Sequence, residues 1–122
     1  MNRAVSLLSG MMLLASFVSA EAASLAGKYQ AAGKNLDGMP YSGTAEIIAT
    51  SDTTCKISWQ TAAVASQGIC MRNGNSFAAS YALGNAIGLV VYQIKPDGTL
   101  EGLWTIAGQN GVGSELLTPM KP

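Results

Sequence analysis

The sequence contains no histidine, and charged residues make up only 11% of its 122 residues. The lack of histidine removes the commonest general base and the commonest metal ligand in proteins. Seven lysines and arginines balance seven aspartates and glutamates, so the chain has no net charge. It therefore lacks the excess of positive charge that attracts nucleic acid. We expect no nucleic-acid binding, no metal site and no cofactor.

The remaining groups for acid–base chemistry are scattered carboxylates. Asp37, Asp52 and Asp97 lie in segments with the composition of turns, where a carboxylate accepts hydrogen bonds from backbone amides. The other carboxylates available for a catalytic pair are Glu46, Glu101 and Glu115. Without histidine, only a lysine or a carboxylate could act as the base of a catalytic triad, and the lysines are expected to be solvated. We therefore predict no catalytic residue and no enzymatic activity.

The first twenty residues have the order of a secretory signal peptide. Arg3 supplies a positive charge, residues 4–18 carry none, and Val18 and Ala20 are suitable residues before a cleavage site. The uncharged run is shorter than the roughly 20 residues that span a bilayer. We therefore expect a helical signal peptide at 1–20, with cleavage possible as late as residue 22. The mature chain, 21–122, is then a single periplasmic or secreted domain, monomeric and without a membrane span.

Export also decides the interpretation of the two cysteines, Cys55 and Cys70. In an oxidising compartment, two cysteines are most simply paired in one disulfide. A metal site would need two more ligands, and no histidine is available. Closing a loop of this length is expected to stabilise the fold by about 3 kcal/mol.

The expected disulfide also predicts a strand register. If the two cysteines face each other across an antiparallel pair, Ile57 lies opposite Gly68 and Trp59 lies opposite Ser66. The turn then falls at residues 62–63. Small residues opposite large ones make this hairpin sterically reasonable.

The mature chain alternates between polar and apolar residues in short segments separated by turn signals. Segments with this period-two pattern are typical of β-strands. The expected strands cover 28–32, 41–50, 55–60, 66–70, 76–81, 87–94, 100–106 and 114–118. Eight strands joined by hairpin turns leave two exposed edges unless the sheet closes. We therefore predict an all-β fold, an eight-stranded antiparallel up-and-down barrel, with a two-sheet β-sandwich as the alternative.

Three stretches resemble a group of small exported bacterial proteins that are labelled as hypothetical or fibronectin-binding-like. They are Gly27-Lys28-Tyr29, the turn and strand start at 35–44, and the segment 91–104. The opening Gly-x-aromatic pattern is also similar to that of lipocalin and avidin-type barrels. These resemblances imply a β-barrel fold and carry over no ligand-binding residue.

The aromatic residues are the only candidate binding feature. Trp59, Tyr81 and Trp104 fall on faces that also carry aliphatic residues, so they either fill the core or line a ligand cavity. Alanines on the same inward faces leave room for such a cavity. Tyr41 and Tyr92 are expected on outward faces, where they cover the sheet or meet a partner.

Three function classes follow. The first is an exported, non-enzymatic binding module that recognises a protein or an envelope component. The second is a carrier of a small apolar ligand inside the barrel, and the third is a periplasmic inhibitor of a hydrolase. A cavity on the order of a few hundred Å³ lined by Trp59, Tyr81 and Trp104 favours the carrier. An exposed apolar patch favours the first or third class.

Overall fold

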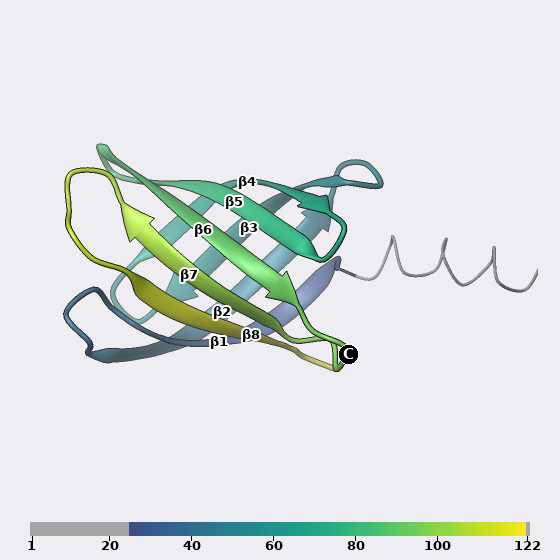
Figure 1. The fold of residues 1–122 in the computed structure, drawn as a ribbon, viewed down its shortest axis with the longest axis horizontal. Coiled ribbons are helices and arrows are strands. Elements are labelled where there is room, and N and C mark those ends of the chain that lie inside the picture. Colours follow the sequence, from purple (N-terminus) through teal and green to yellow (C-terminus); the bar gives the residue numbers. More distant parts are fainter. Residues whose placement is uncertain (1–24, 122) are drawn as a thin grey trace, which may run out of the picture.

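A computed structural model describes residues 25–121, so the expected signal peptide at 1–20 lies outside the described residues. Residues 25–121 form a closed antiparallel barrel in which each strand pairs with the next along the chain (Figure 1). The strands are β1 (Gly27–Lys34), β2 (Pro40–Ala49), β3 (Thr54–Thr61), β4 (Ala65–Asn73), β5 (Ser76–Leu83), β6 (Ala86–Ile94), β7 (Leu100–Ile106) and β8 (Gly113–Pro119). The last strand, β8, pairs with β1, which closes the sheet. The predicted up-and-down barrel is confirmed, and the sandwich alternative is wrong.

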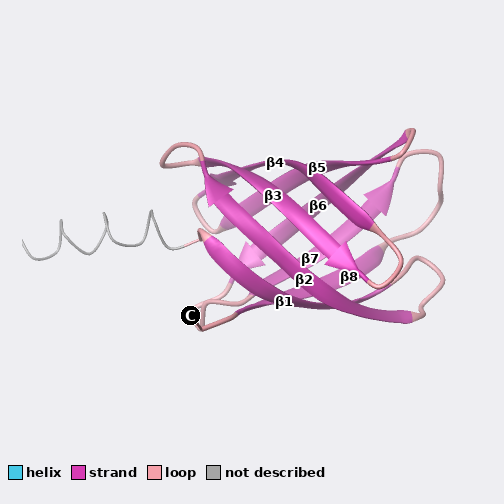
Figure 2. Ribbon diagram, turned by 180° about the vertical axis from the view of Figure 1, so that it is seen from behind, coloured by secondary structure: helices cyan, strands magenta, loops and turns pink. Residues whose placement is uncertain are grey.

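Both termini of the described chain lie at the same end of the barrel (Figure 2). We call the end formed by the β1–β2, β3–β4, β5–β6 and β7–β8 connections the open end. The other end, here the closed end, carries residue 25 and the chain terminus after β8. In the described part of the chain, no helix is long and apolar enough to cross a membrane.

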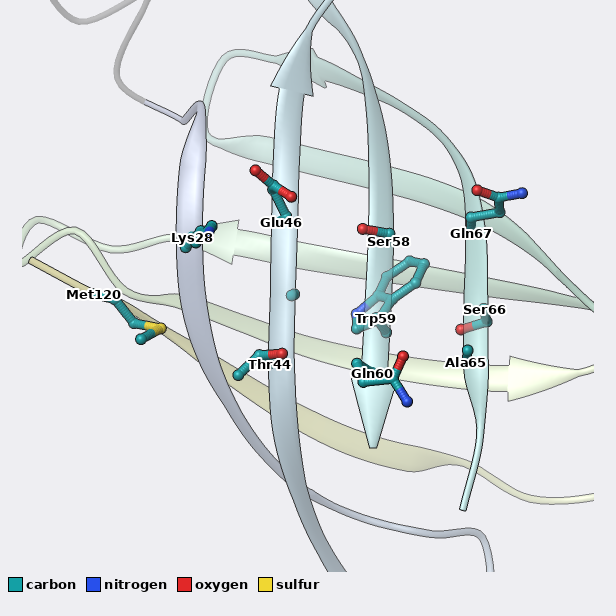
Figure 3. Close-up of a pocket in the computed structure, with 11 residues that line it drawn as sticks. Lys28, Thr44, Glu46, Ser58, Trp59, Gln60, Ala65, Ser66, Gln67 and Met120 are labelled. Atoms are coloured by element: carbon teal, nitrogen blue, oxygen red, sulfur yellow. The ribbon is translucent and has the colours of Figure 1, made fainter. Parts of the chain in front are cut away.

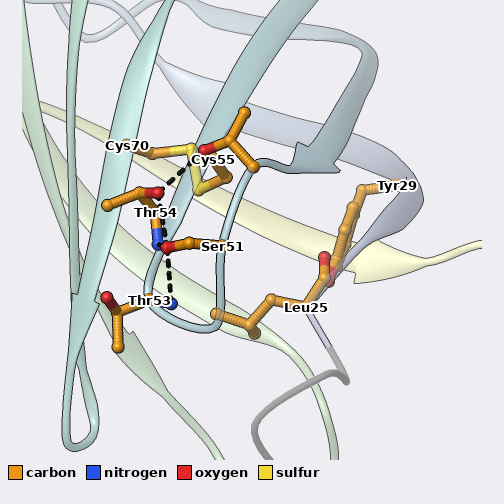
Figure 4. Close-up of a disulfide and its surroundings, with 8 residues drawn as sticks. Leu25, Tyr29, Ser51, Thr53, Thr54, Cys55 and Cys70 are labelled. Carbon is orange, nitrogen blue, oxygen red and sulfur yellow. Dashed lines mark hydrogen bonds between the residues drawn. A yellow bond between two sulfur atoms is a disulfide. The ribbon is translucent and has the colours of Figure 1, made fainter.

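The disulfide lies toward the closed end (Figure 4). Cys55 and Cys70 are directly paired residues of β3 and β4, with their Cα atoms 4.9 Å apart. The register that follows is the predicted one, with Ile57 opposite Gly68 and Trp59 opposite Ser66. The disulfide therefore joins adjacent strands.

Apolar side chains fill the closed half of the barrel. Leu25 packs against this core, and its carbonyl oxygen accepts a hydrogen bond of 2.7 Å from the Tyr29 hydroxyl. The rings of Phe77 and Tyr92 stack there, with their centroids 5.7 Å apart. The largest fully buried side chains are Ile57, Phe77, Tyr92, Leu100 and Leu117. This half of the barrel is a packed core.

Two of the three aspartates expected in turns accept the predicted hydrogen bond from a backbone amide. A carboxylate oxygen of Asp37 accepts a hydrogen bond of 3.0 Å from the backbone amide of Met39. Asp97 accepts from both the backbone amide and the hydroxyl of Thr99, and these bonds lower the pKa of its carboxyl. Asp52 lies in the exposed turn before β3. These carboxylates lie in turns, away from the barrel interior.

Inward-facing aromatic rings lie across glycines of the neighbouring strand. Each ring faces a glycine directly paired with it, and the four pairs are Tyr41 with Gly33, Tyr81 with Gly88, Tyr92 with Gly102, and Trp104 with Gly113. A Cβ atom at Gly102 would lie 2.5 Å from Cδ1 of Tyr92. Glycine is therefore required at this position for packing, because any side chain would push the ring away.

The substitution Gly102→Ala tests this packing. Because Tyr92 is fully buried and cannot swing into solvent, we expect a loss of about 1–3 kcal/mol in the free energy of unfolding, as for other overpacked cores. Urea denaturation followed by tryptophan fluorescence measures it. Ser58→Ala, on the exposed side of β3, is the control and should change stability by less than about 0.5 kcal/mol. Equal stability of the two variants would contradict the packing argument.

Candidate functional site

The open half of the barrel contains a cavity of about 550 Å³. This volume lies within the range of about 300–1,000 Å³ that is typical of small-molecule sites. Its mouth is formed by residues of the open-end connections and its wall by inward-facing residues of the strands. The lining residues are Asn35, Pro40, Tyr41, Ser42, Trp59, Thr61, Ala62, Ala63, Val64, Ser66, Tyr81, Leu83, Val90, Tyr92, Trp104, Ile106 and Glu115.

One carboxylate, that of Glu115, is buried in this cavity wall. Glu115 is 7% exposed and is the one buried charged side chain among the described residues. It lies in β8 directly between Gly33 of β1 and Gly102 of β7. Because both flanking residues are glycines, the rings of Tyr41 and Tyr92 can lie across them and reach Glu115.

Three donors hold this carboxylate. The Tyr41 hydroxyl donates to Oε1 over 2.8 Å. Oε2 accepts two hydrogen bonds, one of 3.0 Å from Nε1 of Trp59 and one from the Tyr92 hydroxyl. Hydrogen bonds to an ionised acceptor are shorter and stronger than neutral ones, and they offset part of the cost of burying the charge. The arrangement, which we call the Glu115 cluster, joins β2, β3, β6 and β8.

The surroundings also keep the tyrosines protonated. Burial, followed by the nearby negative charge of Glu115, raises the pKa of Tyr81 to about 12. The same two causes, together with the hydrogen bonds to Glu115, hold the pKa values of Tyr41 and Tyr92 well above the ordinary value of 10.0. These hydroxyls are therefore donors throughout the neutral and mildly alkaline range.

The three aromatic residues predicted from the sequence all line the cavity. The rings of Trp59 and Tyr81 meet edge to face with their centroids 5.2 Å apart, and both residues are buried. Trp104 is partly buried, and its Nε1 donates a hydrogen bond of 3.2 Å to the carbonyl oxygen of Ser114. Its ring meets that of Tyr41 edge to face, with centroids 6.2 Å apart. The structure thus brings the three residues to one site.

The expectation that Tyr41 and Tyr92 face outward is wrong. Tyr92 is completely buried, and both hydroxyls reach the Glu115 carboxylate inside the barrel. In the sequence, Val91 and Tyr92 are both apolar enough to face the core, so alternation alone left the face undecided. The same ambiguity between Leu116 and Leu117 hid the inward position of Glu115, which sequence reasoning missed. The glycines within the strands were the sequence signal that could have indicated this site. Gly33 and Gly102 each pair directly with an inward tyrosine on one side and with Glu115 on the other.

A second hollow lies on the outer surface over β1–β4 and has a volume of about 660 Å³ (Figure 3). Exposed polar side chains surround it, including those of Thr44, Ser58 and Gln60. No buried charge or group of convergent donors marks this hollow among the described residues. Although its volume is larger, we place the candidate site in the barrel interior, where the Glu115 cluster and the aromatic rings converge.

The outward-facing side chains over β4–β7 differ in polarity from those over β1–β3. Met71, Ala78, Val91 and Leu103 form a directly paired apolar row across β4–β7. On β1–β3, most outward positions instead carry polar and charged side chains. The outer apolar face over β4–β7 comprises Ile69, Met71, Ile87, Leu89, Val91 and Leu103, each between 47% and 70% exposed. Exposed apolar groups this close together are typical of interaction surfaces.

Comparison with solved structures supports the fold. A redesigned β-barrel, b11L5F_LGL, is 15% identical with a TM-score of 0.72, covering 82% of this chain and 95% of its own. The redesigned barrel mFAP1, solved bound to DFHBI, is 17% identical with a TM-score of 0.69, covering 78% and 95%. A fluorescence-activating β-barrel designed de novo is 19% identical with a TM-score of 0.65, covering 81% and 96%. At these identities the likeness shows the barrel fold alone.

No protein-family model matches the sequence, and no curated protein matches it. The resemblance to exported barrel proteins therefore holds at the level of the β-barrel, and the fibronectin-binding-like label gains no support. Fold and site together define a small up-and-down barrel with one packed half and one hollow half that contains a buried carboxylate.

The raised tyrosine pKa values predict how stability depends on pH. An unfolded tyrosine loses its proton near pH 10, whereas the folded chain holds it to higher pH, so deprotonation favours the unfolded state. The stabilisation is therefore fully present below about pH 10 and is lost as the pH rises toward the folded pKa, which is about 12 for Tyr81. Urea denaturation between about pH 8 and about pH 11 measures the decline. Tyr81→Phe should decline less steeply than the wild type, and equal slopes would contradict the assignment.

Proposed function

We propose that this protein binds a small molecule with a largely apolar body inside the open half of the barrel, without transforming it. The observation that carries the proposal is the cavity of about 550 Å³, lined by Trp59, Tyr81 and Trp104 around the buried Glu115. Sites of this kind combine apolar and aromatic walls with a few polar groups that orient the ligand. Among the three function classes, the carrier is the one that this cavity favours.

Two further observations support the proposal. The barrel mFAP1, which shares the fold, was solved bound to the small molecule DFHBI. The cavity opens at the end opposite the described chain termini, so neither terminus of the described chain stands over its mouth. The Cys55–Cys70 disulfide is consistent with an oxidising compartment, and hence with an exported carrier.

The residues of the cavity wall are better suited to binding than to catalysis. The wall offers one carboxylate, that of Glu115, and the sequence has no histidine to serve as its partner. General acid–base catalysis usually needs two groups whose protonation states differ. The tyrosines of the Glu115 cluster are held as protonated donors, which can orient a ligand.

A pair of adjacent valines tests the cavity. Val90 points into it, and Val91 points outward from the same strand. Fluorescence titration with the neutral dye N-phenylnaphthylamine should show binding to the wild type. Val90→Trp should weaken the affinity by about tenfold or more, because the indole occupies ligand space. Val91→Trp should leave it unchanged. Absence of dye binding to the wild type, or equal effects of the two substitutions, would contradict the proposal.

The outer apolar face favours a second candidate function, recognition of an envelope component. We infer an apolar lipid surface as that component, because the face carries no charged side chain at its centre, where Leu89, Val91 and Leu103 are exposed. Burying such side chains is worth roughly 1.5–3 kcal/mol each. This function uses the outside of the barrel and is independent of the cavity.

Flotation with phospholipid vesicles tests the second candidate. The wild type should float with phosphatidylethanolamine–phosphatidylglycerol vesicles, and Val91→Glu should remain in the bottom fraction because a charge then faces the lipid. Ser58→Glu, which places the same charge on the outward side of β3, is the matched control and should float. A wild type that stays with the bottom fraction would exclude this function while leaving the carrier function intact.

A further inference from the structure

The charge inside the cavity restricts what it can bind. Glu115 is 7% exposed, and none of the described residues lining the cavity is a lysine or an arginine. The one ion pair described in residues 25–121, between Lys95 and Glu101, lies on the surface. Within the part of the chain that the structure describes, hydrogen bonds alone therefore compensate the buried carboxylate. An isolated buried charge remains costly even when it accepts hydrogen bonds, and a counter-charge lowers that cost.

The carboxylate also has an acceptor position left. An ionised carboxylate offers about four lone-pair positions. Among residues 25–121, Oε2 accepts from Trp59 and Tyr92, whereas Oε1 accepts from the Tyr41 hydroxyl alone. Glu115 is itself one of the residues that line the cavity. A donor on a bound molecule can therefore complete the set of hydrogen bonds at Oε1.

The walls around this position suit a cation with an apolar body. The rings of Trp59, Tyr81 and Trp104 line the cavity, and aromatic faces attract ammonium groups, most strongly when water is excluded. Leu83, Val90 and Ile106 complete the wall with aliphatic surface. An anionic head group would instead meet the negative charge of Glu115 with no cationic side chain beside it.

We propose that the ligand is an organic cation, a protonated amine with an apolar or aromatic body, whose ammonium group donates to Oε1 of Glu115. This inference rests on the proposed carrier function and specifies the ligand's chemical class. The cavity then discriminates by charge, because three ligands of one shape would differ only in the group that meets the carboxylate.

Three probes with the same apolar body test the inference: phenylbutylamine, phenylbutanol and phenylbutyrate. Each is titrated against the complex of the protein with N-phenylnaphthylamine, and displacement of the dye reports its affinity. Phenylbutylamine should bind about tenfold or more tighter than phenylbutanol, as expected for one charge-assisted hydrogen bond. Phenylbutyrate should bind most weakly. Equal affinities, or preference for phenylbutyrate, would overturn the inference.

Matched variants assign the preference to one residue. Glu115→Gln should abolish the tenfold difference between amine and alcohol, whereas Glu46→Gln, which removes the same charge from the outer hollow, should preserve it. If Glu115→Gln does not fold, Tyr41→Phe replaces it. That variant removes the donor to Oε1 and keeps the charge, so the preference must persist, and its loss would overturn the inference.

The two levels of the proposal fail differently. If the dye binds and the probes displace it equally, the carrier function stands and the cation inference fails. If the dye does not bind the wild type, the carrier function fails, and the inference fails with it.

Discussion

The interaction on which the interior depends is the burial of one carboxylate. Glu115 is held by hydroxyls of Tyr41 and Tyr92 and by the indole nitrogen of Trp59. Because an unsatisfied buried charge would be prohibitively costly, all three side chains must reach it at once. This requirement draws strands from different parts of the barrel toward one point and sets the boundary between the packed half and the hollow half.

Glycine makes this geometry possible. Gly33 and Gly102 flank Glu115 in the sheet. Each glycine lies beneath the ring of a tyrosine, Tyr41 or Tyr92, whose hydroxyl donates a hydrogen bond to the Glu115 carboxylate. The pairs at Gly88 and Gly113 place Tyr81 and Trp104 in the same way farther along the wall. Because these large rings lie against residues without side chains, they leave space at the centre of the open half, so a barrel rich in aromatic groups can still contain a cavity.

Much of the fold could be predicted from alternation and turn chemistry. Both signals are local: strands show a period of two, and turns require particular residues. The cysteines carried one further fact, the register of β3 and β4, because only paired positions could join them. Predicting Trp59, Tyr81 and Trp104 as inward residues succeeded since their neighbours alternate clearly. It failed at Tyr92, where β6 is apolar on both faces, and there local pattern does not distinguish inside from outside.

The sequence by itself determined the all-β character, the order of the strands along the chain and the pairing of the two cysteines, because each follows from patterns between near neighbours or from a single pair of cysteines. Only the tertiary structure decided that the sheet closes into a barrel and what its interior contains. Glu115 is 74 residues from Tyr41 and 56 from Trp59 along the chain, and nothing in their local sequence shows that they meet. Closing β8 onto β1 brings them together, because closure converts separate inward positions into one shared space with its own charge and shape.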